Sequence, residues 1–122
     1  MTLITQADLN QATGTSQYHQ YLFGLKYTDG IDFLVEKCKC YWLLDAIASY
    51  YATQIKFKGH LNSFCVWNFT KRENDWVLTA RADTGEEPFV TQEFVTNFDK
   101  YSSITDLKLF LCNGVLMVPS EY

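Results

Sequence analysis

Apolar residues in the first half of the chain recur at helical spacing in two neighbouring segments. The first segment follows Thr28 and Asp29, either of which can cap a helix, and its apolar residues lie at positions i, i+3, i+4 and i+7: Ile31, Leu34, Val35 and Cys38. The second segment ends near Thr53 and repeats spacings of three and four in Cys40, Leu43, Leu44, Ile47, Ala48 and Tyr51. The pattern predicts two amphipathic helices, each burying one face.

The N-terminal region gives weaker signals. Residues Thr5 to Asp8 match a capping box with a carboxylate at its fourth position, which predicts a short helix that ends near Gly14. The stretch from Ser16 to Lys26 is rich in aromatic and amide side chains without clear periodicity, so it is predicted to be irregular or helical.

After Gly59 the period of the apolar residues changes from about 3.6 to 2, which is typical of β-strands. A hairpin is predicted from strands at 64–69 and 76–81 joined by a polar turn, and a third strand at 89–95 follows Pro88. Strands at 107–112 and 115–118 flank Asn113-Gly114, the dipeptide best suited to the positive φ angles of a type I′ turn.

Helices followed by strands predict an α+β fold, because each element must bury its apolar face against another. We expect a single domain over residues 1–122, with N-terminal helices packed on one face of a C-terminal antiparallel β-meander of about five strands.

Composition narrows the class of protein. The 122 residues are 48% hydrophobic and 20% charged, which is the range of ordinary globular domains. The formal net charge of -4 argues against direct nucleic-acid binding, which requires clustered Lys and Arg. No apolar run approaches the roughly 20 residues that span a bilayer, and the N-terminus lacks the pattern of a signal peptide. We therefore expect a cytoplasmic protein without a membrane partner.

Candidate catalytic and metal-binding residues are few. Cys38 and Cys40 are separated by one residue, whereas zinc sites favour two to four, so these cysteines are expected to be reduced core residues. His19 and His60 are the two histidines, and none of the common nucleophile, zinc-protease or phosphate-loop motifs occurs. We expect no metal, no cofactor and no catalytic residue.

Acidic residues gather at the start of the first amphipathic helix, where Asp29, Asp32 and Glu36 are explained by capping and by the helix dipole.

A candidate binding surface lies on the flank of the second helix. Trp42, Asp45 and Ser49 are spaced by three and four residues and lie off its core stripe, which favours a partner-binding surface. The alternative is that Trp42 packs beneath the N-terminal arm while Asp45 accepts a hydrogen bond from the backbone.

Three segments resemble a known family: Tyr27-Thr28-Asp29-Gly30, Tyr41 to Ser49 (YWLLDAIAS) and the terminal Pro119-Ser120-Glu121-Tyr122. They are similar to a family of small bacterial, plasmid and phage proteins that is catalogued as a domain of unknown function. The resemblance runs from Gly14-Thr15 to the last residue and brings no activity, cofactor or catalytic residue with it. Occurrence on mobile elements implies an accessory role in conflict with host defences.

We therefore expect a non-enzymatic protein-interaction module of a mobile genetic element, such as an inhibitor of a host defence complex like a CRISPR effector. Its partner would be a host or phage protein. The alternative is a small enzyme or ligand-binding domain with a pocket between helices and sheet, using Asp29, Asp45 or His19 as polar contacts. A homodimer that pairs edge strands or buries aromatic residues is a third possibility.

Overall fold

The α+β class is confirmed by the computed structural model, which describes residues 3–11, 18–83 and 85–122. The described helices are α1 (Gln6–Asn10), α2 (Asp29–Lys37), α3 (Tyr41–Tyr50) and α4 (Gly59–Ser63), with short helical turns η1 (Leu22–Gly24), η2 (Tyr51–Ile55), η3 (Phe98–Lys100) and η4 (Pro119–Glu121). The strands are β1 (His19–Gln20), β2 (Lys26–Tyr27), β3 (Cys65–Lys71), β4 (Trp76–Arg81), β5 (Pro88–Phe94), β6 (Asp106–Cys112) and β7 (Val115–Met117).

Capping residues fix the starts of α1 and α2 where the sequence predicts them. The Thr28 hydroxyl accepts a hydrogen bond from the Ile31 backbone amide at the start of α2. Thr5 and Asp8 form the predicted capping box of α1, which ends at Asn10; the predicted end at Gly14 lies outside the described residues. Lys39, in the left-handed region with a φ of 52°, separates α2 from α3.

The helical structure extends further than the sequence predicts. The predicted end near Thr53 falls inside η2, a π-helical turn that continues α3 to Ile55. The helix α4 then occupies residues where a change to strand periodicity was predicted. Five residues are too few for a helical period to show in the sequence, so α4 was missed.

The sheet differs from the predicted meander. It has seven strands in the order β1-β2-β7-β6-β3-β4-β5, and β2 pairs with β7 in parallel. Strands β3, β4 and β5 form the predicted antiparallel meander, and Asn113-Gly114 forms the predicted turn between β6 and β7. The prediction of about five antiparallel strands is therefore only partly right.

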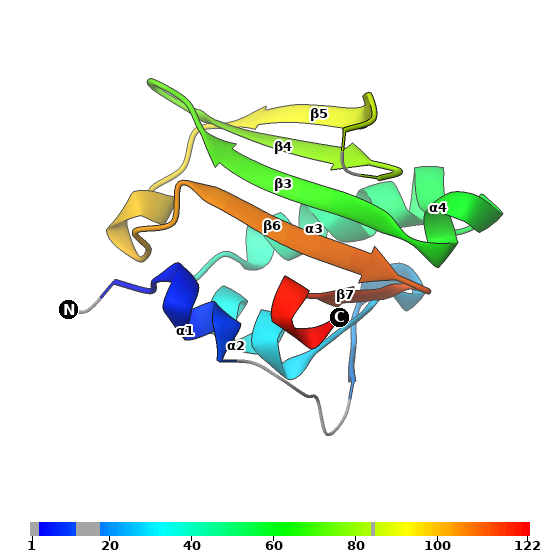
Figure 1. Cartoon of the computed structure of the whole chain (residues 1–122), viewed down its shortest axis with the longest axis horizontal. Helices are drawn as coiled ribbons and strands as arrows, with labels where there is room; N and C mark the ends of the chain where they lie inside the picture. The colour runs from blue at the N-terminus through cyan, green and yellow to red at the C-terminus, as the bar shows by residue number, and fades with distance from the viewer. Residues whose placement is uncertain (1–2, 12–17, 84) are drawn as a thin grey trace.

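Burial explains why β6 leaves the meander. After β5 the chain crosses through η3, and β6 then pairs with β3 in the middle of the sheet (Figure 1). Leu107, Leu109 and Leu111 of β6 alternate along the strand and are all buried, whereas β5 buries only Val90. A strand with a full apolar face is stabilised most between two neighbours, and the more polar strand is left at the edge.

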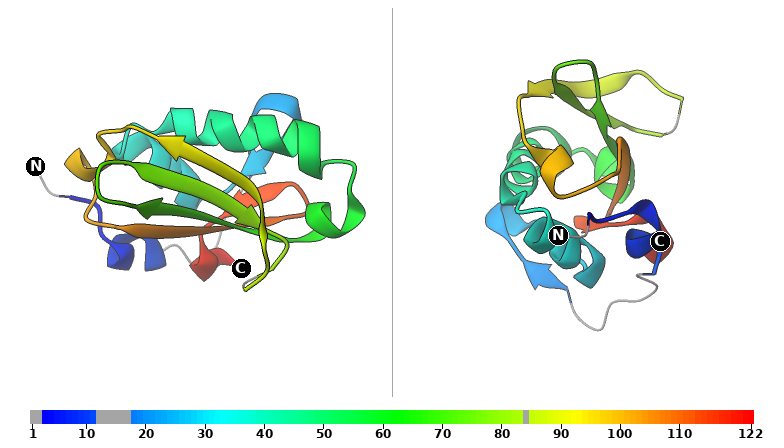
Figure 2. Two further views of the ribbon diagram at one scale, coloured as in Figure 1. Left: turned by 90° about the horizontal axis from the view of Figure 1, so that it is seen from above. Right: turned by 90° about the vertical axis from the view of Figure 1, so that its left-hand side faces the viewer.

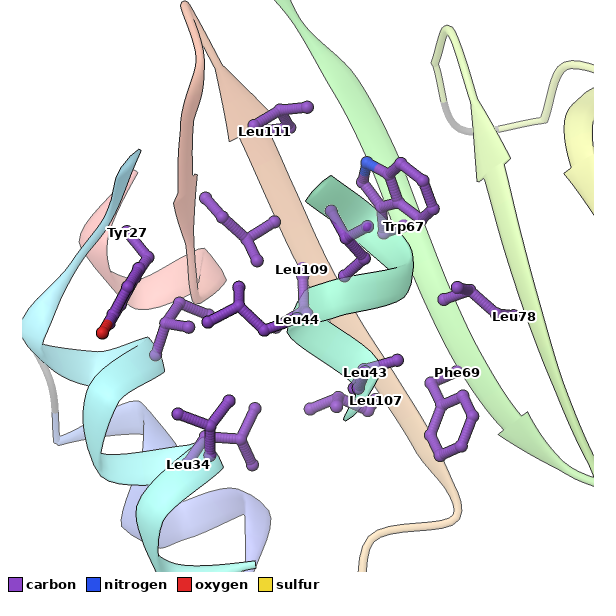
Figure 3. Close-up of a cluster of buried hydrophobic side chains, with 14 of the residues drawn as sticks. Tyr27, Leu34, Leu43, Leu44, Trp67, Phe69, Leu78, Leu107, Leu109 and Leu111 are labelled. Atoms are coloured by element: carbon purple, nitrogen blue, oxygen red, sulfur yellow. The ribbon is translucent and has the colours of Figure 1, made fainter. Parts of the chain in front are cut away.

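The helices α2 and α3 cover one face of the sheet, as predicted. The first helix, α1, does not join them but packs beside η4 on the other side, where the Ser120 hydroxyl donates a hydrogen bond to the Leu9 carbonyl at 3.2 Å (Figure 2). Figure 2 shows the strands between α3 on one side and η4, with the C-terminus, on the other. Leucines of α2 and α3 face the sheet across the core, where leucines of β6 lie beside Trp67 and Phe69 of the neighbouring strand β3 (Figure 3).

Candidate protein-interaction groove at the sheet edge

Strand β5 forms an edge of the sheet and pairs with β4 alone in the described part of the chain. Pro88 begins the strand, and a register shift between Ala80 and Arg81 disturbs the pairing at that end. Both features are common protections of an edge strand. The other end, from Thr91 to Phe94, has regular pairing and no proline or lysine, and Val95 follows with 93% of its surface exposed.

An open groove of about 680 Å³ lies beside this regularly paired end of β5. We call it the edge groove; its lining residues are Trp42, Phe94, Val95, Thr96 and Asn97. The Trp42 ring from α3 forms its wall, with ring centroids 5.4 Å from Phe94 and 5.6 Å from Phe69. The groove is thus built where α3 crosses the end of the edge strand.

The three residues predicted as a binding surface have different settings. Trp42 is half-buried and lines the edge groove, while Asp45 and Ser49 are exposed and are not among the groove residues. The carboxylate of Asp45 accepts a short hydrogen bond from the Tyr21 hydroxyl. The Ser49 carbonyl accepts a hydrogen bond from the Thr53 hydroxyl at 2.9 Å, which is an ordinary helical contact.

The structure gives the ring contacts of Trp42 and the partner of Asp45. Trp42 packs on Phe69 and Phe94 of the sheet, and the hydrogen-bond donor to Asp45 is the Tyr21 side chain and not the backbone group that the alternative predicted. Phe94 and Val95 were missed as site residues because their sequence signal is that of an ordinary strand end. Only the edge position of β5 exposes them, and strand order is set by distant pairings.

The Tyr21–Asp45 contact changes the acidity of the phenol. Burial, followed by the hydrogen bond to the Asp45 carboxylate and its negative charge, raises the pKa of Tyr21 to about 12. Tyr21 therefore stays neutral at physiological pH and donates its proton to Asp45. This contact ties the segment before η1 to α3.

A second polar contact joins His19 of β1 to Asp29 at the start of α2. The His19 Nε2 atom lies 2.9 Å from Asp29 Oδ1, and the imidazole stacks on the Tyr27 ring at 5.0 Å. Of the three polar residues considered for a ligand pocket, the structure thus brings His19 and Asp29 together, while Asp45 binds Tyr21. The contact links β1 to the start of α2.

The C-terminus is tied to the same helix start. Glu121 Oε1 accepts hydrogen bonds from the Thr28 hydroxyl at 2.6 Å and from the Val118 amide at 3.2 Å, and Oε2 lies 3.3 Å from the Gly30 amide. A carboxylate here also interacts favourably with the dipole of α2. Two of the segments that resemble the known family therefore meet in space.

The cysteines are unpaired thiols in the structure, and Cys38, Cys40 and Cys65 are buried. A hydrogen bond from Cys40 lowers the pKa of Cys38, while the same contact and burial raise the pKa of Cys40. Burial raises the pKa of Cys65 to about 12. Among the described residues, no three His, Cys, Asp or Glu side chains gather in a way that could hold a metal ion.

The space between the helices and the sheet is filled by side chains. The gap there is lined only by apolar residues of α2, α3, β6 and β7, and it leaves no room for a water molecule: Ile31, Leu34, Val35, Leu43, Leu44, Ile47, Leu109 and Leu116. The edge groove lies elsewhere, at the sheet edge, and it is open to solvent.

Comparisons with known proteins place the chain in a family without assigning an activity. No curated protein and no solved structure matches the chain. Within the described residues, no helix is both long and apolar enough to cross a membrane. The family of unknown function DUF6876 matches residues 3–122, and the chain therefore belongs to this family.

Proposed function

We propose that the chain is a non-enzymatic protein-interaction module whose partner inserts an extended segment along the free edge of β5. The observation that carries this proposal is the edge groove, which places apolar side chains directly beside unpaired strand backbone. Partner segments commonly add a strand to an exposed sheet edge, where main-chain hydrogen bonds give affinity and side-chain pockets give specificity.

The backbone of β5 offers hydrogen bonds to such a segment. Alternate residues of an edge strand direct their N–H and C=O groups away from the sheet, where they bind water until another strand pairs with them. The region from Thr91 to Phe94 is suited to this role because its pairing with β4 is regular. Glu93 is held by Arg72 at 2.6 Å, which reduces the effect of its charge on an approaching strand.

The chemistry of the groove favours binding over catalysis. Its lining residues are two aromatic rings, one aliphatic side chain, one hydroxyl and one amide, and none of them titrates near neutral pH. A general acid or base would have to come from outside the groove. Half-buried aromatic residues such as Trp42 are typical anchors for an apolar partner side chain.

The proposed biological setting is that of an accessory protein that occupies the surface of a host defence complex, such as a CRISPR effector. The sequence resemblance to proteins of mobile elements and the acidic composition support this setting. The edge groove adds a surface through which a 122-residue protein could block its partner sterically.

The proposal is tested with three baits in pull-downs from a host lysate: the native chain, Val95→Glu and Phe57→Glu. Val95 and Phe57 are both highly exposed apolar residues, at 93% and 88%, so the two variants change the same property at different places. A partner of the edge groove is retained by the native chain and by Phe57→Glu and is lost from Val95→Glu. A stoichiometric partner retained equally by all three baits would contradict the proposal.

The same variants also test whether the occupant of the groove is a second copy of the chain. If it is, light scattering of the native chain at several concentrations would show a dimer, and Val95→Glu would restore the monomer. Two β5 edges paired across a two-fold axis would produce that result. It would identify the module as a homodimer and contradict the proposed heterologous partner.

A further inference from the structure

Large apolar side chains are also exposed at the other end of the molecule. Leu22 and Phe23 of η1 are 50% and 55% exposed, and Phe57, just after η2, is 88% exposed. Lys56 and Lys58 flank Phe57 and are exposed. We call these five residues the lysine–aromatic patch.

Lys56 holds the two parts of the patch together. Its Nζ atom donates a hydrogen bond to the Phe23 carbonyl at 3.1 Å and lies 5.8 Å from the centre of the Phe57 ring. Phe23 has a φ of 60°, a left-handed conformation that aromatic residues rarely adopt. Such a conformation persists only where the surrounding structure imposes it, and here it accompanies an apolar side chain presented to solvent.

The patch carries two lysines and no acidic residue, on a protein with a net negative charge. The chain has a net charge of -4, yet it contains no acidic residue between Asp8 and Asp29 or between Asp45 and Glu73. Those two stretches include every residue of the patch. The acidic turn between β4 and β5, with Glu86 and Glu87, emerges on the opposite side of the sheet from η1 (Figure 2).

We propose that the lysine–aromatic patch binds the surface of a membrane containing anionic lipids, with Phe57, Phe23 and Leu22 inserted between headgroups. This proposal replaces the sequence-based expectation of no membrane partner, and it goes beyond the binding of a protein partner at the edge groove. Lysines near a membrane gain favourable energy from anionic headgroups, and aromatic and aliphatic side chains enter the interface between headgroups and acyl chains. The contact needs no spanning segment, so it is compatible with the absence of a spanning helix from the described residues.

The shape of the patch favours a bilayer over a protein as the occupant. A side chain with 88% of its surface exposed projects from the molecule, as Phe57 does. A protein partner would have to supply a matching socket for each projecting side chain, whereas a fluid bilayer accommodates them without one. The opposite end of the molecule, where β5 ends beside the edge groove, stays free to bind a partner (Figure 1).

The test is co-sedimentation of the full chain with phosphatidylcholine vesicles, with and without about one third phosphatidylserine, at low and physiological salt. We expect binding to the anionic vesicles only, and weaker binding as salt increases. Phe57→Ala should lower the partition coefficient by about tenfold, and Lys58→Gln by about fivefold. Val95→Ser is the matched control, because it removes an equally exposed apolar side chain at the other end and should leave partitioning unchanged.

Three results would overturn the proposal: equal binding to neutral and anionic vesicles, no binding to anionic vesicles, or native-like binding by Phe57→Ala and Lys58→Gln. Tighter binding to a single-stranded oligonucleotide or an acidic peptide than to the vesicles would identify a different occupant. Circular dichroism confirms the fold of each variant, and both positions are exposed, so neither is expected to destabilise the protein.

Discussion

Replacing Trp42 by alanine tests how the edge groove is built. The ring is half-buried and contacts two aromatic neighbours, Phe69 at 5.6 Å and Phe94 at 5.4 Å. Truncating a fully buried Trp costs about 3–5 kcal/mol of folding free energy. Aromatic pairs contribute about 0.5–1.5 kcal/mol beyond their burial. Partial exposure lowers the first value, so we expect Trp42→Ala to destabilise the fold by about 2–3 kcal/mol.

The assay is urea unfolding followed by circular dichroism, because loss of a tryptophan alters the fluorescence signal itself. Ser49→Ala is the control on the same helix face, and it should change stability by less than about 0.5 kcal/mol. Trp42→Phe should retain most of the native stability, since a ring still meets Phe94. A loss below about 1 kcal/mol for Trp42→Ala would refute the reasoning, because the ring could not then be packed on both neighbours. Binding effects are therefore measured at Val95, where stability and binding can be separated.

Three further predictions concern other parts of the molecule. Gly114→Val should lower the free energy of unfolding by at least about 2 kcal/mol, because Gly114 has a φ of +79° and an added Cβ would lie 2.8 Å from the Tyr51 hydroxyl. The loss, measured by urea unfolding, should be smaller in a Tyr51→Phe background. A neutral result would contradict the turn geometry. Tyr21 has its pKa raised from 10.0 to about 12, so its contribution to stability is complete below pH 10 and is lost as the pH rises through 12. Tyr21→Phe should therefore lose less stability than the native chain between these pH values, and an identical pH dependence of the two proteins would rule out the contact with Asp45. Elemental analysis of protein purified without chelator should show substoichiometric zinc, because the Cys-x-Cys spacing suits packing better than ligation; one tightly bound zinc per chain would overturn this.

Local signals in the sequence predicted most individual elements. The Thr28 cap of α2, the apolar stripe of α3 and the Asn113-Gly114 turn all depend on neighbouring residues, so the chain specifies them without long-range information. Elements of two residues, such as β1 and β2, are too short to show alternation, and they form only because β7 offers an edge to pair with. The predicted meander failed at β6 for a similar reason, since local patterning does not fix strand order.

The candidate site could be predicted only in part. Trp42 was identified because a large aromatic residue off a helical core stripe is conspicuous in the sequence. Its grouping with Asp45 and Ser49 assumed that one helix flank forms one surface, whereas Tyr21 binds Asp45 and the sheet packs against Trp42. The position of Val95 beside Trp42 results from the edge placement of β5, which no spacing along the chain encodes.

The most direct test of the central claim is hydrogen–deuterium exchange across β5, with and without the partner recovered by the native and Phe57→Glu baits. If the partner adds a strand at the edge groove, outward-facing amides between Thr91 and Val95 should exchange at least about tenfold more slowly in the complex. Amides of β3 and β6, which are already paired on both sides, should change little. Protection that leaves β5 unchanged and appears elsewhere on the molecule would contradict the proposal.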